Sequence, residues 1–175
     1  DCTISVIDVP KAEASRFGIM ICDDQNQVTD FVEKPKEPKS TLASMGIYVF
    51  TWEKLRKYLI ENENEANAKR DKGEPWSKRS EEHTDIITSM LRDKQRLFAY
   101  EFEGYWKDVG TLDSLWEANM DLLSPSVPLD LYDPSWKIYS RNSNMPPQYV
   151  GDNANIENSM ISEGSTIDGT VDFSI

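Results

Sequence analysis

Apolar and β-branched residues gather in four short runs near the start of the chain, with residues typical of turns between them. The runs cover residues 3–9, 17–22, 28–33 and 43–50. Runs of this length, bounded by residues such as Asp23 and Asn26, are typical of β-strands. The pattern therefore predicts four strands within the first 50 residues.

After residue 50 the apolar residues fall three or four positions apart, as on one face of a helix. Trp52, Leu55 and Tyr58 predict a helix from residue 52 to about residue 61. Residues 62–82 are polar and charged and contain one large apolar residue, Trp76. We expect this segment to be an exposed, mobile loop.

The helical spacing returns twice more, on either side of a further strand. Residues 86–91 predict a second helix, and residues 97–102 alternate as a half-buried strand does, with Phe98, Tyr100 and Phe102 on one face. Thr111 is an expected N-cap of a third helix. The buried stripe of that helix would be Leu112, Leu115, Trp116, Met120 and Leu123. Interleaved strands and helices predict an α/β layer fold.

Residues 124–147 contain five of the nine prolines and read as an extended linker. Beyond it, aliphatic residues recur every five or six positions, at Val150, Ile156, Ile161 and Ile167. This spacing is typical of hexapeptide repeats in a β-helix. We therefore predict three regions: an α/β domain over residues 1–123, a linker over 124–147, and the beginning of a β-helix over 148–175.

Composition narrows the classes of function. The net charge of −12 argues against nucleic acid or an anionic membrane as partner, and no apolar run is long enough for a membrane span. Two cysteines, Cys2 and Cys22, fit a reducing cytoplasm and no disulfide framework. The single histidine, His83, makes a histidine-dependent triad or zinc site improbable, and we expect it to be solvated.

The eight glycines form neither a dinucleotide-binding loop nor a P-loop. The chain also opens with Asp1 directly before a predicted strand. We therefore expect a piece of a longer protein, in which any loop that holds nucleotide phosphates precedes Asp1.

Glu33 and Lys34 end the third predicted strand, and Pro35 should keep Lys34 extended. On extended backbone their side chains would point to opposite faces, so no ion pair between them is expected. The two residues are either an exposed charged turn or a lysine for a phosphate beside a carboxylate for sugar hydroxyls.

Three further residues have both a structural and a functional interpretation. Gly18 is either a glycine at the entry of a strand or part of a ligand site. Gly46, which together with Ser44 interrupts an otherwise apolar strand, permits the close approach either of a ligand or of another backbone in the sheet. Asp108 lies between a strand end and a helix start, where α/β sheets bind ligands. It is either a carboxylate favoured by the helix N-terminus or a Mg²⁺ ligand.

Several long motifs, in this order, resemble bacterial ADP-glucose pyrophosphorylase, also called glucose-1-phosphate adenylyltransferase. They are EASRFGIM, FVEKP, ASMGIYVF, GYWKDVGTLDSLWEANMDLL and YDPSWKIYSRN, followed by hexapeptide repeats. The resemblance implies the later part of a Rossmann-like nucleotidyltransferase domain, then the start of a left-handed β-helix. It also implies a cytoplasmic enzyme, tetrameric in its complete form, that makes ADP-glucose and pyrophosphate from ATP and glucose 1-phosphate for glycogen synthesis.

The same resemblance assigns roles to individual residues. Lys34 would hold the phosphate of glucose 1-phosphate, Glu33 and Ser44 would bind the sugar, and Gly18 would line the site through its backbone. Asp108 would be one of two aspartates that bind Mg²⁺. The other aspartate and the nucleotide loop would lie upstream, so we expect the isolated piece to be inactive.

One segment departs from the family pattern. Where the family usually has aspartate-phenylalanine-glycine-lysine-aspartate, this chain has Glu81-Glu-His-Thr-Asp85, and only Asp85 matches. A regulatory or assembly subunit with a vestigial site is therefore the alternative. A hexapeptide-repeat acyltransferase is disfavoured because the repeats contain no histidine base.

Overall fold

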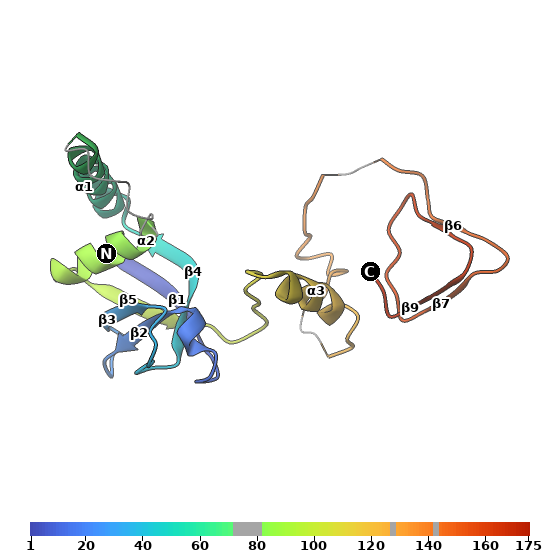
Figure 1. Cartoon of the computed structure of the whole chain (residues 1–175), viewed down its shortest axis with the longest axis horizontal. Coiled ribbons are helices and arrows are strands. Elements are labelled where there is room, and N and C mark those ends of the chain that lie inside the picture. Colours follow the sequence, from blue (N-terminus) through green and yellow to red (C-terminus); the bar gives the residue numbers. More distant parts are fainter. Residues whose placement is uncertain (72–81, 127–128, 142–143) are drawn as a thin grey trace. The chain divides into compact units, whose positions relative to one another are not determined.

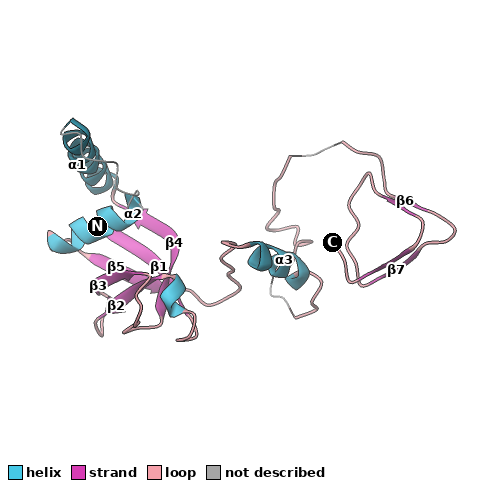
Figure 2. Cartoon of the chain, viewed as in Figure 1, coloured by secondary structure: helices cyan, strands magenta, loops and turns pink. Residues whose placement is uncertain are grey.

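The computed structural model describes residues 1–71, 82–126, 129–141 and 144–175 (Figure 1). The chain divides into two compact units, Asp1–Glu103 and Gly104–Ile175. Unit 1 contains a sheet with helices, and unit 2 contains one helix and two short parallel strand pairs (Figure 2). Within the described residues, no helix has both the length and the apolar character that a membrane crossing requires.

Unit 1 confirms the four strands predicted in the first 50 residues. They are β1 (Cys2–Asp8), β2 (Gly18–Cys22), β3 (Val28–Glu33) and β4 (Leu42–Phe50), with a short 3₁₀ turn η1 (Ala14–Arg16) between the first two. Two helices, α1 (Trp52–Asp71) and α2 (Glu82–Arg92), precede the last strand β5 (Leu97–Glu101). Unit 1 therefore has the predicted alternation of strands and helices.

The five strands form one mixed sheet in the order β3-β2-β4-β1-β5. Only β1 and β5 run parallel, and the other neighbours are antiparallel. The turn between β2 and β3 also binds β5, because the amide of Ala99 donates to the carbonyl of Asn26 over 2.8 Å. The β2–β3 hairpin thus spans from β4 at one end to β5 at the other.

The core lies on the face of the sheet that α2 covers. Ile4 and Met20 of the sheet meet Ile87 and Met90 of α2, and all four are fully buried. Burial also raises the pKa of the Cys2 thiol to about 12. Helix α1 is tied to the loop after α2, since the Tyr58 hydroxyl donates to Asp93 over 3.1 Å.

Two sequence predictions about unit 1 are wrong. Residues 62–71 belong to α1 rather than to a loop: six of the ten are Ala, Glu, Lys or Arg, which favour a helix even without an apolar stripe. The rest of the predicted loop lies outside the described residues, except for its last residue, which begins α2. In β5 the inward residues are Leu97 and Ala99, whereas Phe98 and Tyr100 face outward.

Unit 2 begins with a loop that leads into α3 (Leu112–Asp121). Thr111 is its N-cap, as predicted: the Thr111 hydroxyl accepts from the Ser114 amide, and the Ser114 hydroxyl accepts from the Thr111 amide. The predicted buried stripe is wrong for Leu112, Leu115 and Trp116. These side chains are exposed, because no apolar layer in the described part of unit 2 covers them.

The end of the chain forms two parallel strand pairs. Strand β6 (Tyr149–Val150) pairs with β8 (Thr166–Ile167), and β7 (Asn155–Glu157) pairs with β9 (Thr170–Asp172). The described residues of the predicted linker 124–147 contain no helix or strand. The chain thus returns alongside itself, as hexapeptide repeats predict, while the handedness of a β-helix and the three predicted domain boundaries stay predictions.

Candidate active site

The sheet register brings three of the predicted site residues together in unit 1. Gly18 lies opposite Glu33 on β3, and the pairing of Ile19 with Ala43 places Gly18 next to Ser44 on β4. The three residues share the face that carries the core. The parallel strands β1 and β5 end close to this row of residues, and the carboxyl ends of parallel strands are where α/β sheets bind ligands.

Gly18 is a glycine because two side chains fill the place of a Cβ atom. A Cβ built there would lie 2.7 Å from the Phe31 ring and 2.8 Å from Glu33 Oε2. Phe31 is buried and cannot swing away. The Glu33 carboxylate therefore lies directly over the backbone of Gly18. This contact supports the prediction that Gly18 is part of the candidate site.

Lys34 and Glu33 form an ion pair, with 3.2 Å between Lys34 Nζ and Glu33 Oε1. The prediction that they would not pair is wrong because Lys34 is not extended. Its φ of +44° turns the chain at the end of β3, and its amide donates to the carbonyl of Phe17 over 3.0 Å. This left-handed turn brings consecutive side chains to the same side and holds a cation beside a carboxylate.

Ser44 is fixed by an irregular stretch of β4. Ile4 pairs with Tyr48 whereas Val6 pairs with Ser44, so β4 has extra residues between these pairs. Gly46 lies in this bulge with φ +74°, a conformation that favours glycine. The Ser44 hydroxyl lies 3.2 Å from the Tyr48 hydroxyl and accepts from the Gly46 amide. The bulge therefore fixes the hydroxyl of a residue that lies next to Gly18 in the sheet.

Asp108 belongs to unit 2, whereas the other predicted site residues belong to unit 1. It is exposed in the loop before α3, and Gly110 leaves room for it: a Cβ at Gly110 would lie 3.3 Å from Asp108 Oδ2. A carboxylate is the donor that Mg²⁺ prefers, but a site needs several ligands. Across the described ranges no three His, Cys, Asp or Glu residues converge as metal ligands. The described residues thus fit Mg²⁺ in donor type and not in number.

The sequence analysis missed a polar network around the Asp108 loop. Lys107 Nζ lies 3.1 Å from Glu117 and 3.3 Å from Asp121, and the Tyr105 hydroxyl donates to Asp121 over 2.9 Å. These contacts raise the pKa of Lys107, with Glu117 as the main cause, whereas burial and then Asp121 raise the pKa of Tyr105. The available signal was the spacing of Glu117 and Asp121, one turn apart on α3.

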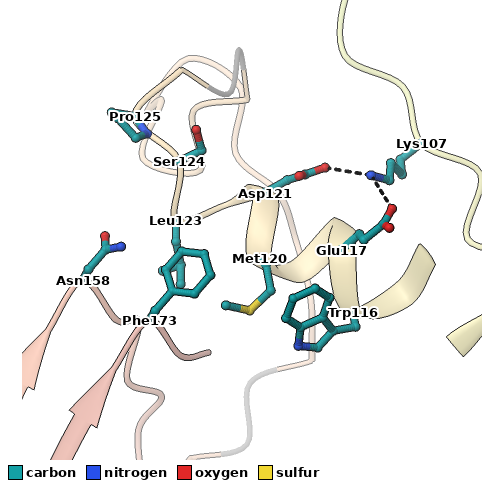
Figure 3. A pocket seen from close by; sticks show the side chains of 10 residues that line it. All are labelled: Lys107, Trp116, Glu117, Met120, Asp121, Leu123, Ser124, Pro125, Asn158 and Phe173. Atoms are coloured by element: carbon teal, nitrogen blue, oxygen red, sulfur yellow. Dashed lines mark hydrogen bonds and ion pairs between the residues drawn. The ribbon is translucent and has the colours of Figure 1, made fainter. Parts of the chain in front are cut away.

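The network borders a cavity of about 490 Å³ within unit 2 (Figure 3). Its apolar wall includes Trp116, Met120, Leu123 and Phe173 (Figure 3). Lys107 is the cation on its lining, and two carboxylates already neutralise it. The cavity therefore does not compete with the Glu33–Lys34 cluster as a phosphate site.

Comparison with known sequences identifies the family of this chain. The profile of the nucleotidyl transferase family, described as "Nucleotidyl transferase", matches residues 1–125. The chain belongs to that family. It is 53% identical to the glucose-1-phosphate adenylyltransferase of Geobacillus stearothermophilus over 100% of the chain and 43% of that protein. The enzyme of that name from Clostridium acetobutylicum is 49% identical, over 98% of the chain and 42% of its own length.

This nucleotidyl transferase chain thus spans less than half the length of the curated relatives it matches. The family profile covers the whole of unit 1 and continues through α3 to residue 125. Both the Glu33–Lys34 cluster, which includes Gly18 and Ser44, and Asp108 therefore lie inside the matched region. His83 and Asp85, in the segment that departs from the family pattern, fall within α2.

Proposed function

We propose that this chain is part of a glucose-1-phosphate adenylyltransferase and supplies the sugar-phosphate side of its active site. The observation that carries the proposal is the Glu33–Lys34 pair over Gly18, beside Ser44, in a chain about half identical to enzymes of that name. ATP and glucose 1-phosphate are the proposed substrates, and ADP-glucose and pyrophosphate the products.

Each residue of the cluster has a chemistry that suits one part of glucose 1-phosphate. The Lys34 ammonium is half exposed and carries three N–H donors, so it can contact Glu33 and also donate to a phosphate. The Glu33 carboxylate accepts hydrogen bonds from sugar hydroxyls. The Ser44 hydroxyl can both donate and accept, and Gly18 lets the ligand approach the backbone.

In the proposed reaction, an oxygen of the glucose 1-phosphate attacks the α-phosphorus of ATP. A new P–O bond forms, the bond to the bridging oxygen of the β-phosphate breaks, and pyrophosphate leaves with that electron pair. Lys34 keeps the attacking phosphate in place and offsets the repulsion between two anions. Its role is therefore binding and orientation rather than proton transfer.

The remaining assignments extend this proposal. Asp108 would contribute one carboxylate to Mg²⁺, which supplies charge neutralisation when it is bound. The strand pairs β6–β8 and β7–β9 would begin a left-handed β-helix, which would serve contacts in a homo-oligomer. The enzyme would work in the cytoplasm and feed glycogen synthesis.

The test is steady-state synthesis of ADP-glucose by the full-length native protein, wild type beside Lys34→Ala. Loss of a charged hydrogen bond to phosphate should raise KM for glucose 1-phosphate about 10- to 100-fold. The KM for ATP should change little. Lys36→Ala is the matched control, because Lys36 is an exposed lysine two residues away.

An unchanged KM for glucose 1-phosphate in Lys34→Ala would contradict the assigned role of Lys34. A folded wild-type protein that makes no ADP-glucose would contradict the activity itself. In that case a regulatory subunit with a vestigial site becomes the better description.

A further inference from the structure

We propose that Asp121 and Glu117 of α3 are positioning residues for Asp108, because they hold the loop that carries it through Lys107 and Tyr105. The proposal rests on the proposed function, in which Asp108 takes part in the reaction. It concerns contacts within unit 2 alone. None of these four residues was among those that the sequence analysis singled out.

The loop is anchored on the side that precedes Asp108. Tyr105 and Lys107 are two residues apart, and both bind the same carboxylate oxygen, Asp121 Oδ2, over 2.9 and 3.3 Å. Lys107 also reaches Glu117 Oε2 over 3.1 Å. Figure 3 shows Lys107 between the two carboxylates of α3. A helix therefore fixes two alternate residues of the loop from one side.

The loop is also anchored on the side that follows Asp108. The hydroxyl groups of Thr111 and Ser114 lie 3.0 Å apart, and each also accepts from the backbone amide of the other residue. Asp108 thus lies between two fixed points: Lys107, held by the C-terminal part of α3, and Thr111, the N-cap of the same helix. Three residues of chain between two anchors leave little freedom for the Asp108 carboxylate.

The anchor is more than one surface ion pair. The Lys107 side chain is 29% exposed and that of Asp121 is 34% exposed, so water screens their contact only in part. The shared Asp121 oxygen joins a neutral donor, the Tyr105 hydroxyl, and a cation, the Lys107 ammonium, in one network. Removal of the Asp121 carboxylate breaks two contacts, one to Tyr105 and one to Lys107. Removal of the Glu117 carboxylate breaks only its contact with Lys107.

Two measurements on the full-length native protein test the proposal. The first is the rate of trypsin cleavage after Lys107, because a lysine held by two carboxylates must be released to enter the protease. In Asp121→Asn and in Asp121→Asn/Glu117→Gln, cleavage should become at least about fivefold faster, since local opening governs proteolysis. Cleavage after the exposed Lys39 serves as the internal standard.

The second measurement separates kcat from KM in ADP-glucose synthesis. A misplaced Asp108 should lower kcat about 10- to 100-fold, the usual cost of losing a group that orients a functional residue. The KM for glucose 1-phosphate should stay within about twofold, because unit 1 holds that substrate in the proposed function. Glu61→Gln is the matched control, since it removes an exposed i,i+4 ion pair with Lys57 on α1.

Faster cleavage after Lys107 together with a selective loss of kcat supports the proposal. Unchanged cleavage overturns it, and so does faster cleavage with an unchanged kcat, because the loop would then be held for a reason other than the reaction. A wild-type protein that makes no ADP-glucose overturns the proposed function and, with it, the catalytic part of this proposal. Unchanged cleavage in the variants, with an active wild type, overturns only the positioning role.

Discussion

The two units of this chain are stabilised in different ways. Every buried apolar residue that the structure describes belongs to unit 1, from Cys2 to Ala99. In the described part of unit 2 the one buried residue is Ser114, and large apolar side chains such as Trp116 and Trp136 are exposed. Unit 1 is therefore stabilised by an apolar core, whereas the described part of unit 2 is stabilised by polar contacts near α3 and by the backbone pairing of its short strands.

The predicted site residues are distributed over both units, so this difference applies to them as well. The Glu33–Lys34 cluster is attached to a sheet whose core is closed by α2, so its geometry depends on apolar packing. Asp108 is attached to a loop whose geometry depends on a capping box and on the network around Lys107. Substitutions in unit 1 should therefore lower the free energy of unfolding more than substitutions in unit 2, and their effects should extend over more of the structure.

The largest effect is expected from the core of unit 1. Ile87→Ala should lower the free energy of unfolding by about 2–5 kcal/mol, because Ile87 is fully buried and its removal leaves a cavity. Urea denaturation followed by far-UV circular dichroism measures this loss. Ile60→Ala is the matched control, since Ile60 lies on α1 and is 41% exposed.

The control should cost well under half as much as the core substitution. If the two variants lose equal stability, burial does not distinguish the two positions. That result would contradict the statement that an apolar core stabilises unit 1.

An intermediate effect on stability is expected at Gly18, which lies between the buried core of unit 1 and the Glu33–Lys34 cluster. Gly18→Ala places a methyl group against the Phe31 ring and the Glu33 carboxylate, and overpacking of this kind costs about 1–3 kcal/mol. It should also displace Glu33 and raise KM for glucose 1-phosphate. The same denaturation experiment and initial-rate kinetics give both quantities.

Gly169→Ala is the matched control for this substitution. Nothing lies within 4 Å of a Cβ at Gly169, so its stability should change by less than about 0.5 kcal/mol. Equal losses for Gly18→Ala and Gly169→Ala would show that the loss comes from the backbone and not from contact with Phe31 and Glu33.

Much of unit 1 could be predicted from the sequence, because alternation within short runs is a local signal. The end of α1 could not be predicted in this way. Residues 62–71 continue the helix through helix-forming residues that present no apolar face, and the prediction relied on apolar spacing. In β5 the prediction followed the large aromatic residues and chose the wrong face as the buried one. The inward residues are instead the smaller ones, which belong to the same buried cluster as Ile4 and Ile87.

The roles of the candidate site residues stay predictions, and the structure adds their geometry. Motif resemblance indicated Gly18, Glu33, Lys34 and Ser44, and the sheet register places the first two and Ser44 in one row. The Glu33–Lys34 pair was missed because a single left-handed residue before a proline reverses the expected alternation. The Lys107 network was missed because it joins residues 10 and 14 positions apart, across a loop and a helix.

The smallest effect is expected at the helix cap of unit 2. Thr111→Val keeps the shape of the side chain and removes the oxygen that accepts from the Ser114 amide, which should cost about 0.5–2 kcal/mol. Hydrogen exchange should become faster in the first turn of α3 and stay unchanged in the core of unit 1. Thr111→Ser keeps the oxygen and is the matched control, with exchange in α3 close to wild type. Faster exchange across unit 1 in Thr111→Val would contradict the contrast drawn here, because it would mean that a polar cap in unit 2 supports the apolar core of unit 1.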